Sequence, residues 1–249
     1  MSRAGGELVY AIGDIHGCYA PLKELLAQVV CDCAERARGR RPILVFLGDY
    51  IDRGPQSDAV LEAMVWLKRR SDAELHLLKG NHEQALLRFL DEPEGAAGWL
   101  RFGGEETLVS YGVMPPSLEE GLAGLVRARD DLLQRMPAAH LKLLQSLELM
   151  VEVGDYAFVH AGVRPGAGLA AQTEDDLLWI RGGFLDHEGP HEKVIVHGHT
   201  WLGDQPQLYG HRIGVDTGCY ATGVLTAVRI EDDGVAVLQA GAKAQAVAA

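Results

Sequence analysis

The chain has 249 residues and a mass of 27.0 kDa, which is enough for one domain with a sizeable core and short for two. Its hydrophobic fraction of 47% and charged fraction of 23% are typical of globular proteins, and its apolar runs fall far short of the roughly 20 residues that a bilayer-spanning helix needs. The formal net charge of −12 argues against non-specific binding to nucleic acid or anionic membranes, because such binding requires a basic face. A phosphate-bearing ligand is not excluded, since bound cations can invert the local charge.

Cysteine usage and the first residues bear on the cellular compartment. The cysteines at positions 18, 31, 33 and 219 include no second pair at zinc-site spacing, so we expect free thiols in a reducing environment. The N-terminal segment has one arginine, lacks an apolar block that ends in small residues, and leads directly into a strand pattern. We therefore expect no signal peptide and a cytoplasmic protein.

The first third of the chain reads as three strand–loop–helix units. Short apolar runs that end near a glycine predict strands at Leu8–Ile12, Ile43–Leu47 and Leu75–Leu78. Apolar residues recur at helical spacing in Pro21–Ala37, Gln56–Arg70 and Glu83–Leu90. This alternation predicts an α/β fold with a largely parallel sheet.

The rest of the chain has a different pattern. Residues 91–150 carry Gly/Pro punctuation and helical stretches near 118–134 and 137–147, which we interpret as a helical insertion within a single domain spanning residues 1–240. The Ala-rich segment 241–249 is expected to be a flexible tail. Further strands are predicted at Leu149–Val153, Tyr156–His160, Val194–Val196, Arg212–Val215, Val224–Ile230 and Val235–Leu238.

Five short polar motifs follow these strand-like runs. They are GDIHG (13–17), GDYIDRG (48–54), GNHE (80–83), HAG (160–162) and HGHT (197–200). Ligand sites in open α/β sheets form at the carboxyl ends of the strands, so we expect the motifs to meet there. Their carboxylates, amide and imidazoles suit Mn, Fe or Zn, and the absence of thiolates argues against a structural zinc cage. One such motif is common by chance, but five at successive strand ends are not.

In their order and spacing, the motifs resemble the phosphoprotein phosphatase family of calcineurin-like metallophosphoesterases, and especially its small bacterial and phage serine/threonine phosphatases. The resemblance covers about residues 8–218 and extends to the segment from Trp99 to Gly112 and to Trp179-Ile180-Arg181. It implies an α/β sandwich of two mixed β-sheets flanked by helices. It also implies a phosphomonoesterase in which a hydroxide that bridges two metal ions attacks phosphorus in line.

The resemblance assigns roles to individual residues. Asp14, His16 and Asp49 would bind one divalent metal ion, and Asp49, Asn81, His160 and His199 would bind the second, with Asp49 as the bridge. Mn²⁺ is the metal expected first, and Fe or Zn would also fit. Two divalent cations (+4) and two aspartates (−2) leave a charge of +2, which matches a phosphate dianion.

The remaining motif residues would serve the leaving group and the phosphate. By the same resemblance, His82 would protonate the departing alkoxide, and Asp52 would orient His82 and raise its pKa. Arg53 and Arg181 would hold the non-bridging phosphate oxygens. Three nearby residues are expected to have no direct role: His197 as a packing residue, Tyr220 as an ordinary strand aromatic, and Cys18 as a buried thiol rather than an oxidation-sensitive one.

The expected substrate is a phosphorylated protein, with nucleic acid and membrane excluded as partners and the oligomeric state left open. The Asp52-Arg53 pair and Glu83 favour a serine/threonine protein phosphatase. The nearest alternative is a diadenosine tetraphosphate (bis-nucleosyl polyphosphate) hydrolase, a family with a different sequence after the second Gly-Asp and an Asp in place of Glu83. A small phosphate ester would fit equally well, because the two arginines recognise phosphate and not its carrier. A non-catalytic phosphoprotein-binding scaffold is disfavoured, because all six proposed ligands and His82 are present.

Overall fold

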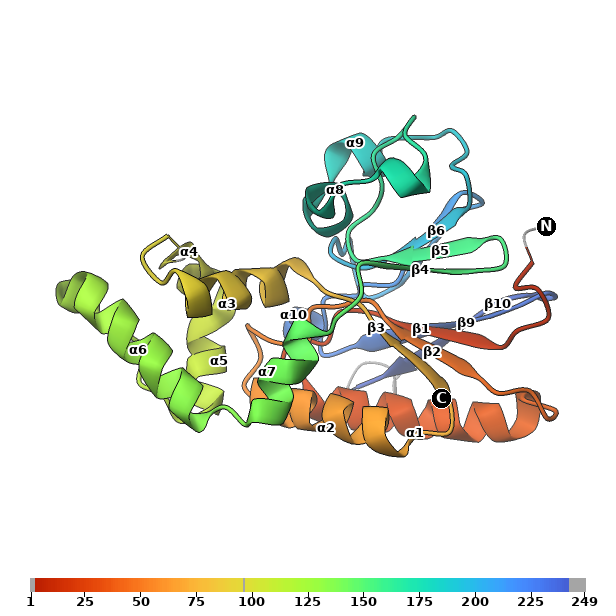
Figure 1. Cartoon of the computed structure of the whole chain (residues 1–249). Helices are drawn as coiled ribbons and strands as arrows, with labels where there is room; N and C mark the ends of the chain where they lie inside the picture. The colour runs from red at the N-terminus through yellow and green to blue at the C-terminus, as the bar shows by residue number, and fades with distance from the viewer. Residues whose placement is uncertain (1–2, 96, 242–249) are drawn as a thin grey trace.

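The chain folds into two five-stranded mixed sheets that pack face to face (Figure 1). The computed structural model describes residues 3–95 and 97–241; the predicted tail at 241–249 lies outside these residues except for its first. In spatial order, the first sheet contains β10 (Gly234–Ala240), β9 (Leu225–Glu231), β1 (Val9–Ile12), β2 (Ile43–Phe46) and β3 (Glu74–Leu77). The second contains β4 (Met150–Val153), β5 (Tyr156–Val159), β6 (Val194–His197), β8 (Arg212–Gly214) and β7 (Gln207–Leu208). The predicted α/β sandwich is confirmed.

The parallel parts of the two sheets end at the same side of the molecule. Strands β1, β2 and β3 are parallel to one another, as are β5, β6 and β8, and the flanking strands are antiparallel. The imidazole Nδ1 of His160, just after β5, donates to the carbonyl oxygen of Leu47, just after β2, at 2.8 Å. This hydrogen bond joins the carboxyl ends of the two sheets where the polar motifs lie.

Alternation along the strands divides the core into layers. Leu8, Tyr10 and Ile12 point away from the second sheet, toward a cluster that includes residues of α1 (Tyr19–Arg36) and α2 (Ser57–Arg70). Val9 and Ala11 point the other way, into the layer between the sheets. The outer face of the second sheet packs on α8 (Glu174–Trp179) and α9 (Gly182–Leu185). The helices thus flank the sandwich on both sides (Figure 1).

The segment between β3 and β4 is helical and lies beside the sandwich (Figure 1). Its first helix starts two residues earlier than predicted, at Asn81. The elements are α3 (Asn81–Asp91), α4 (Ala97–Trp99), a π-helical turn (Leu100–Gly104), α5 (Glu105–Ser110), a 3₁₀ turn (Leu118–Glu120), α6 (Gly121–Arg135) and α7 (Ala138–Gln145). Two further short elements, a 3₁₀ turn (Leu169–Ala171) and α10 (Cys219–Thr222), occur in the second half. That residues 91–150 form an insertion within one domain remains a prediction.

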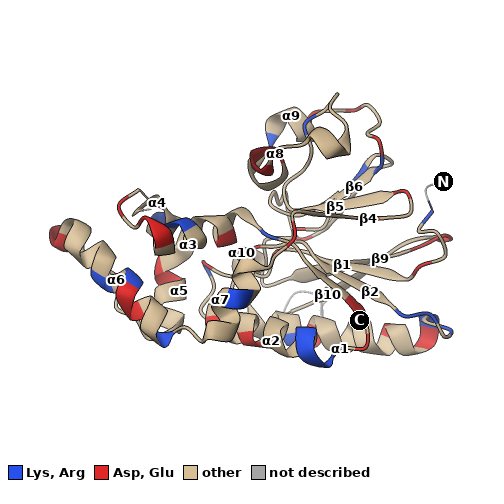
Figure 2. Cartoon of the chain, in the orientation of Figure 1, with Lys and Arg blue, Asp and Glu red and all other residues tan. Residues whose placement is uncertain are grey.

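Charged residues lie mainly on the helices and loops, and both signs are interspersed along α6 (Figure 2). Among the described residues, no helix combines the length and the apolar character that a membrane crossing would require. The strands carry few charges, as expected for sheets with covered faces.

Candidate metal centre

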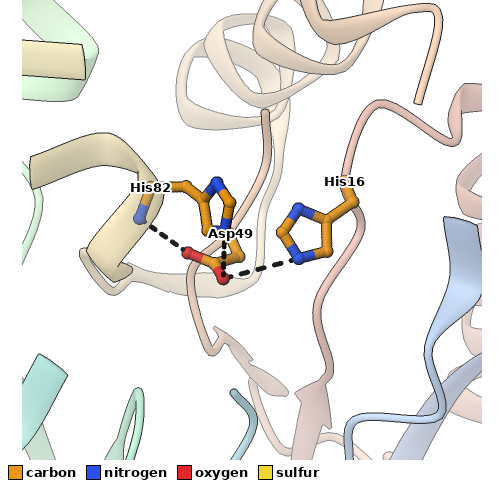
Figure 3. A group of neighbouring side chains, drawn as sticks. All are labelled: His16, Asp49 and His82. Atoms are coloured by element: carbon orange, nitrogen blue, oxygen red, sulfur yellow. Dashed lines mark hydrogen bonds and ion pairs between the residues drawn. The ribbon is translucent and has the colours of Figure 1, made fainter. Parts of the chain in front are cut away.

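Asp49 lies at the centre of the polar cluster. Its Oδ2 atom is 3.5 Å from Nε2 of His16 and 3.5 Å from Nε2 of His160, and all three side chains are buried. Two sets of potential ligand atoms, each within 4.8 Å of one another, share this carboxylate: His16, Asp49 and His82 form one, and Asp49, His160 and His199 form the other. Figure 3 shows the first set, with both imidazoles directed at Asp49. A carboxylate between two imidazole groups is the arrangement that a bridging ligand requires.

Backbone carbonyls fix the orientation of two of these imidazoles. His16 donates from Nδ1 to the carbonyl oxygen of Ile51 at 2.8 Å, and His160 does the same to Leu47. The Nε2 lone pairs therefore point toward Asp49. Burial lowers the pKa of His16 to about 3 and of His199 to about 2, and it also lowers the pKa of His160. The imidazoles are thus held neutral, which is the form that binds metal.

Asn81 and Asp14 complete the set. The Oδ1 atom of Asn81, the first residue of α3, lies 2.9 Å from both His160 Nε2 and His199 Nδ1. Asp14 accepts the backbone N–H of His199 on Oδ2 at 2.9 Å. In the part of the chain that the structure describes, Asp14 Oδ1 and His199 Nε2 are buried without a hydrogen-bond partner. Buried acceptors without donors are costly unless a cation satisfies them, so the residues fit divalent metal ions.

Asp216 is a neighbour of this centre that the sequence reasoning did not include. It is buried, accepts the backbone N–H of Gly218 at 2.8 Å and interacts electrostatically with Asp14. Burial, followed by the charge of the other carboxylate, raises the pKa of Asp14 well above its usual range, and burial raises the pKa of Asp216 to about 6. Asp216-Thr217-Gly218 follows β8 as the other motifs follow their strands, and that signal could have identified it.

Asp52 is a buried acceptor for three side chains. Its Oδ2 accepts from His82 Nδ1 at 2.6 Å and from Trp99 Nε1 at 2.7 Å, and its Oδ1 accepts from Thr107 Oγ1 at 2.6 Å. Burial alone would lower the pKa of His82, but Asp49 and Asp52 outweigh it and raise that pKa above its ordinary value. The segment that holds Trp99 and Thr107 resembles the bacterial phosphatases, yet the resemblance assigned neither residue to Asp52.

His82 therefore differs electrostatically from the imidazoles around it. Its Nε2 lies 3.9 Å from Asp49 Oδ2, close enough to group with a ligand set. Its Nδ1 is committed to a carboxylate, however, and its pKa is raised where those of His16, His160 and His199 are lowered. A raised pKa suits a proton donor better than a metal ligand.

Two arginines border the centre from different sides. The Arg53 guanidinium lies 3.2 Å from His82 Nε2 and 4.7 Å from the ring centroid of Tyr220. Arg181 is exposed and donates to the Thr200 hydroxyl at 3.4 Å, next to His199. Both guanidinium groups can therefore approach a ligand held at the cluster.

The expectation that Tyr220 is a strand aromatic is wrong. Gly218 and Gly223, with φ values of 63° and 75°, bound the short helix α10, which interrupts the strand pattern. The Tyr220 ring packs edge-to-face on His16, with centroids 5.2 Å apart. Tyr220 is thus part of the wall of the site.

The backbone is strained at several residues of the candidate metal centre. Five non-glycine residues of the site have left-handed φ values: His16, Asp49, Asp52, Arg53 and His199. Such conformations persist only where the surroundings enforce them and cluster at functional sites. Close approach explains two motif glycines, because a Cβ at Gly80 would collide with the Asp49 carboxylate and one at Gly198 with the Asp14 carboxylate.

Glu83 holds two of the motifs together. Its carboxylate accepts backbone N–H groups from Asp49 at 2.9 Å, Tyr50 at 2.8 Å and Gly80 at 2.8 Å. Because its hydrogen bonds go to these loops, we infer that its identity reports loop geometry rather than the substrate. This weakens its use as evidence for a protein phosphatase.

Two other residues close to the motifs are engaged in local contacts. His197 is buried and packs edge-to-face on Phe184, with centroids 5.0 Å apart, and its Nδ1 lies 3.0 Å from the carbonyl oxygen of Gly198. Cys18 is half-buried, and its thiol donates to the carbonyl oxygen of His16 at 3.4 Å. Neither residue belongs to the two sets of potential ligands.

The chain belongs to the calcineurin-like phosphoesterase family, whose pattern matches residues 8–223. An asymmetrical bis(5'-nucleosyl)-tetraphosphatase, PrpE, from Geobacillus thermodenitrificans is 28% identical over 238 residues, which cover 88% of each chain. A symmetrical bis(5'-nucleosyl)-tetraphosphatase from Methylococcus capsulatus is 28% identical over 233 residues, 90% of this chain and 66% of that protein.

Solved structures share the fold. One of a candidate diadenosine tetraphosphatase has a TM-score of 0.61 at 22% identity and covers 94% of each chain. A cold-active protein tyrosine phosphatase from a Shewanella species has a TM-score of 0.57 at 21% identity, covering 94% of this chain and 81% of that one. The family expectation is confirmed, whereas the closer likeness to serine/threonine phosphatases is not.

Proposed function

We propose that the chain is a metal-dependent bis(5'-nucleosyl)-tetraphosphate hydrolase and not the protein phosphatase expected from its motifs. The observation that carries this proposal is the likeness to bis(5'-nucleosyl)-tetraphosphatases, which covers 88% of the chain and is therefore not confined to the motifs. One of the two motif features that favoured a phosphatase, Glu83, is weaker evidence, because its carboxylate bonds to the backbone of the loops.

In this proposal two divalent metal ions, with Mn²⁺ first and Fe or Zn as alternatives, are held by the buried cluster. The ligands are Asp14, His16 and Asp49 for one ion, and Asp49, Asn81, His160 and His199 for the other. The metals would supply a nucleophile at neutral pH by lowering the pKa of water. The support lies in the shared position of Asp49, the neutral imidazoles and the unpartnered acceptors of Asp14 and His199.

In the proposal, the side chains around the metals bind the phosphate oxygens and protonate the leaving group. Arg53 and Arg181 hold the oxygens of the phosphate chain through charge-assisted hydrogen bonds. His82 donates the proton that a departing oxygen takes up, and Asp52 keeps its Nδ1 protonated so that Nε2 faces the site. A departing nucleotide phosphate is a better leaving group than an alkoxide, because its second pKa is about 6. A phosphoanhydride therefore needs His82 less than a phosphoserine does.

A substrate panel tests the proposal. Initial rates would be measured with Mn²⁺ on diadenosine tetraphosphate and on a phosphoserine peptide, with EDTA as the control. We expect metal-dependent cleavage of the dinucleotide with kcat/KM well above that of the peptide. A kcat/KM that favours the peptide would overturn the substrate assignment, and activity that survives EDTA would overturn the metal dependence.

A cytoplasmic location is part of the same proposal.

A further inference from the structure

A hollow of about 540 Å³ lies beside the candidate metal centre, between the C-terminal half of α3 and the turn that follows α4. Trp99, Phe102 and Trp179 contribute aromatic surface to its wall, and the charged residues Arg88, Asp91 and Glu92 line it as well. Its volume is in the range of small-molecule sites, which are mostly apolar with a few polar groups that fix orientation.

Two of the three aromatic residues are hydrogen-bonded to Asp52 and to helix α3. Trp99 is buried and donates to the Asp52 carboxylate at 2.7 Å, so one edge of its ring faces the residue that orients His82. Trp179 donates to Gln84 Oε1 at 2.8 Å, and Gln84 is two residues after His82 on α3. The hollow is therefore held at a fixed position relative to the proposed proton donor.

Phe102 connects the hollow to the phosphate-binding side. It also lines a second hollow together with Arg53, Arg101 and Tyr220. A ligand whose phosphates lie against Arg53 could thus extend past Phe102 into the first hollow. Trp179 stands two residues before Arg181, so the wall that Trp179 forms is likewise connected to a proposed phosphate-binding residue.

The aromatic surfaces are open to a ligand. Phe102 is 64% exposed and Trp179 is 42% exposed, although the Trp179 indole nitrogen is already hydrogen-bonded. Exposed rings of this kind stack on flat π-systems, and each base–aromatic stack tightens binding by roughly 5- to 150-fold. Asp91 and Glu92 at the rim offer carboxylate oxygens, which accept from exocyclic amino groups and disfavour an acidic peptide.

We propose that this hollow, with Trp179 and Phe102 as its stacking residues, is a nucleobase subsite that binds one base of the substrate while the attached phosphates occupy the metal centre. The inference rests on the proposed function, because it names how a nucleoside polyphosphate would be selected over a phosphoprotein. An amino-bearing purine such as adenine fits the combination of aromatic walls and carboxylate acceptors.

Competitive inhibition of p-nitrophenyl phosphate hydrolysis by AMP and by ribose 5-phosphate tests the subsite. The two inhibitors share the sugar phosphate and differ in the base. In the wild-type Mn²⁺-loaded protein we expect AMP to bind about tenfold more tightly than ribose 5-phosphate, which is within the range of a single base–aromatic stack. We expect Trp179→Ala and Phe102→Ala to remove most of this difference, with the ratio of the two inhibition constants taken within each variant so that a change in the p-nitrophenyl phosphate rate does not enter.

Trp66→Ala is the matched control, because Trp66 is 59% exposed on α2 and lines a different hollow. It should leave the AMP preference unchanged. Equal inhibition by AMP and ribose 5-phosphate in the wild type, or an AMP preference that survives both Trp179→Ala and Phe102→Ala, would overturn the subsite. An AMP preference in a protein that does not cleave diadenosine tetraphosphate would sustain the subsite and overturn the proposed function.

Discussion

His82 Nδ1 lies 2.6 Å from the Asp52 carboxylate, and both side chains are buried beside Asp49. The imidazole is thus held between a carboxylate that fixes its proton on Nδ1 and the space where a substrate would meet Arg53. This relationship separates His82 from the neighbouring imidazoles and gives the first prediction.

Replacing His82 by Asn should slow turnover according to the leaving group. We expect kcat on a phosphoserine peptide to fall by roughly 10²–10⁴-fold, as is typical of lost general acid catalysis. The fall on diadenosine tetraphosphate should be smaller, because the departing phosphate needs less protonation. Bound metal, measured by mass spectrometry of the dialysed protein, should be unchanged. Loss of one metal ion from the His82→Asn variant would instead make His82 a ligand.

Thr107→Val should weaken the support of Asp52 while the volume of the side chain is nearly kept. The Thr107 hydroxyl donates to Asp52 Oδ1 at 2.6 Å and accepts the Asp52 backbone N–H at 2.9 Å. Its loss removes a donor from the buried carboxylate and leaves Ser57 Oγ, at 3.1 Å, as the remaining acceptor of that N–H. We expect the free energy of unfolding to fall by about 1–3 kcal/mol, measured by urea denaturation. Ser110→Ala on the same helix is the control, since Ser110 bonds to backbone groups away from Asp52. Equal stability losses in the two variants would contradict a special role for Thr107.

Glu83→Gln should loosen the loops that carry Asp49 and Asn81. Glu83 accepts backbone N–H groups through both oxygens, whereas glutamine has only one acceptor oxygen. We expect a drop of about 1–3 kcal/mol in the free energy of unfolding and weaker metal binding, followed by calorimetric titration with Mn²⁺. A variant with wild-type stability and metal affinity would show that these hydrogen bonds are dispensable.

The stability of the metal-free protein should fall as pH rises above neutrality. Burial, followed by Asp49, raises the pKa of Glu83 to about 8, burial raises that of Asp14 well above its usual range, and the carboxylates around His82 raise its pKa too. The folded chain therefore binds more protons than the unfolded chain. The ligand imidazoles have lowered pKa values, so above their ordinary pKa of 6.5 they are neutral in both states and add no slope.

Because the folded chain holds more protons than the unfolded chain, proton linkage makes the free energy of unfolding fall as pH rises. Between pH 6.5 and about pH 8 the free energy of unfolding should decrease by about 1.4 kcal/mol per pH unit for each extra proton held by the folded state. Bound metal keeps Asp14 ionised, so the metal-induced rise in Tm should be larger at the alkaline end of this window. Scanning calorimetry with and without Mn²⁺ measures both. A metal-free protein whose stability rises over the same window would contradict the raised pKa values of Glu83, Asp14 and His82.

The strand–helix alternation and the meeting of the polar motifs at the strand ends could be predicted from the sequence because both are local signals. The motif around Asp14 and the motif around Asp49 each join an apolar strand to a glycine-assisted turn, and the sheet brings their ends together. The partners of Asp52 could not be derived this way. Thr107 lies 55 residues further along the chain and reaches Asp52 only through the packing of α5 on α2.

Tyr220 and Glu83 show two further features that the sequence pattern did not predict. Tyr220 follows a strand pattern, and only the left-handed Gly218 and Gly223 turn that segment into a helix facing His16. Glu83 was interpreted as a marker of the substrate, but its hydrogen bonds hold the backbone of the ligand loops. In the proposed nucleobase subsite, the preference between a phosphoprotein and a dinucleotide would depend on side chains around α3 and α8, which lie outside the motifs.

The most direct test of the central claim is to count the metal ions that depend on Asp49. Wild-type protein and Asp49→Ala would be equilibrated with Mn²⁺, dialysed and analysed by inductively coupled plasma mass spectrometry, with circular dichroism to verify that the variant is folded. Because Asp49 faces His16 on one side and His160 on the other, we expect two Mn²⁺ ions per wild-type chain and a loss of both from the folded variant. A single ion in the wild type, or a folded variant that keeps both, would contradict a dinuclear centre bridged by Asp49.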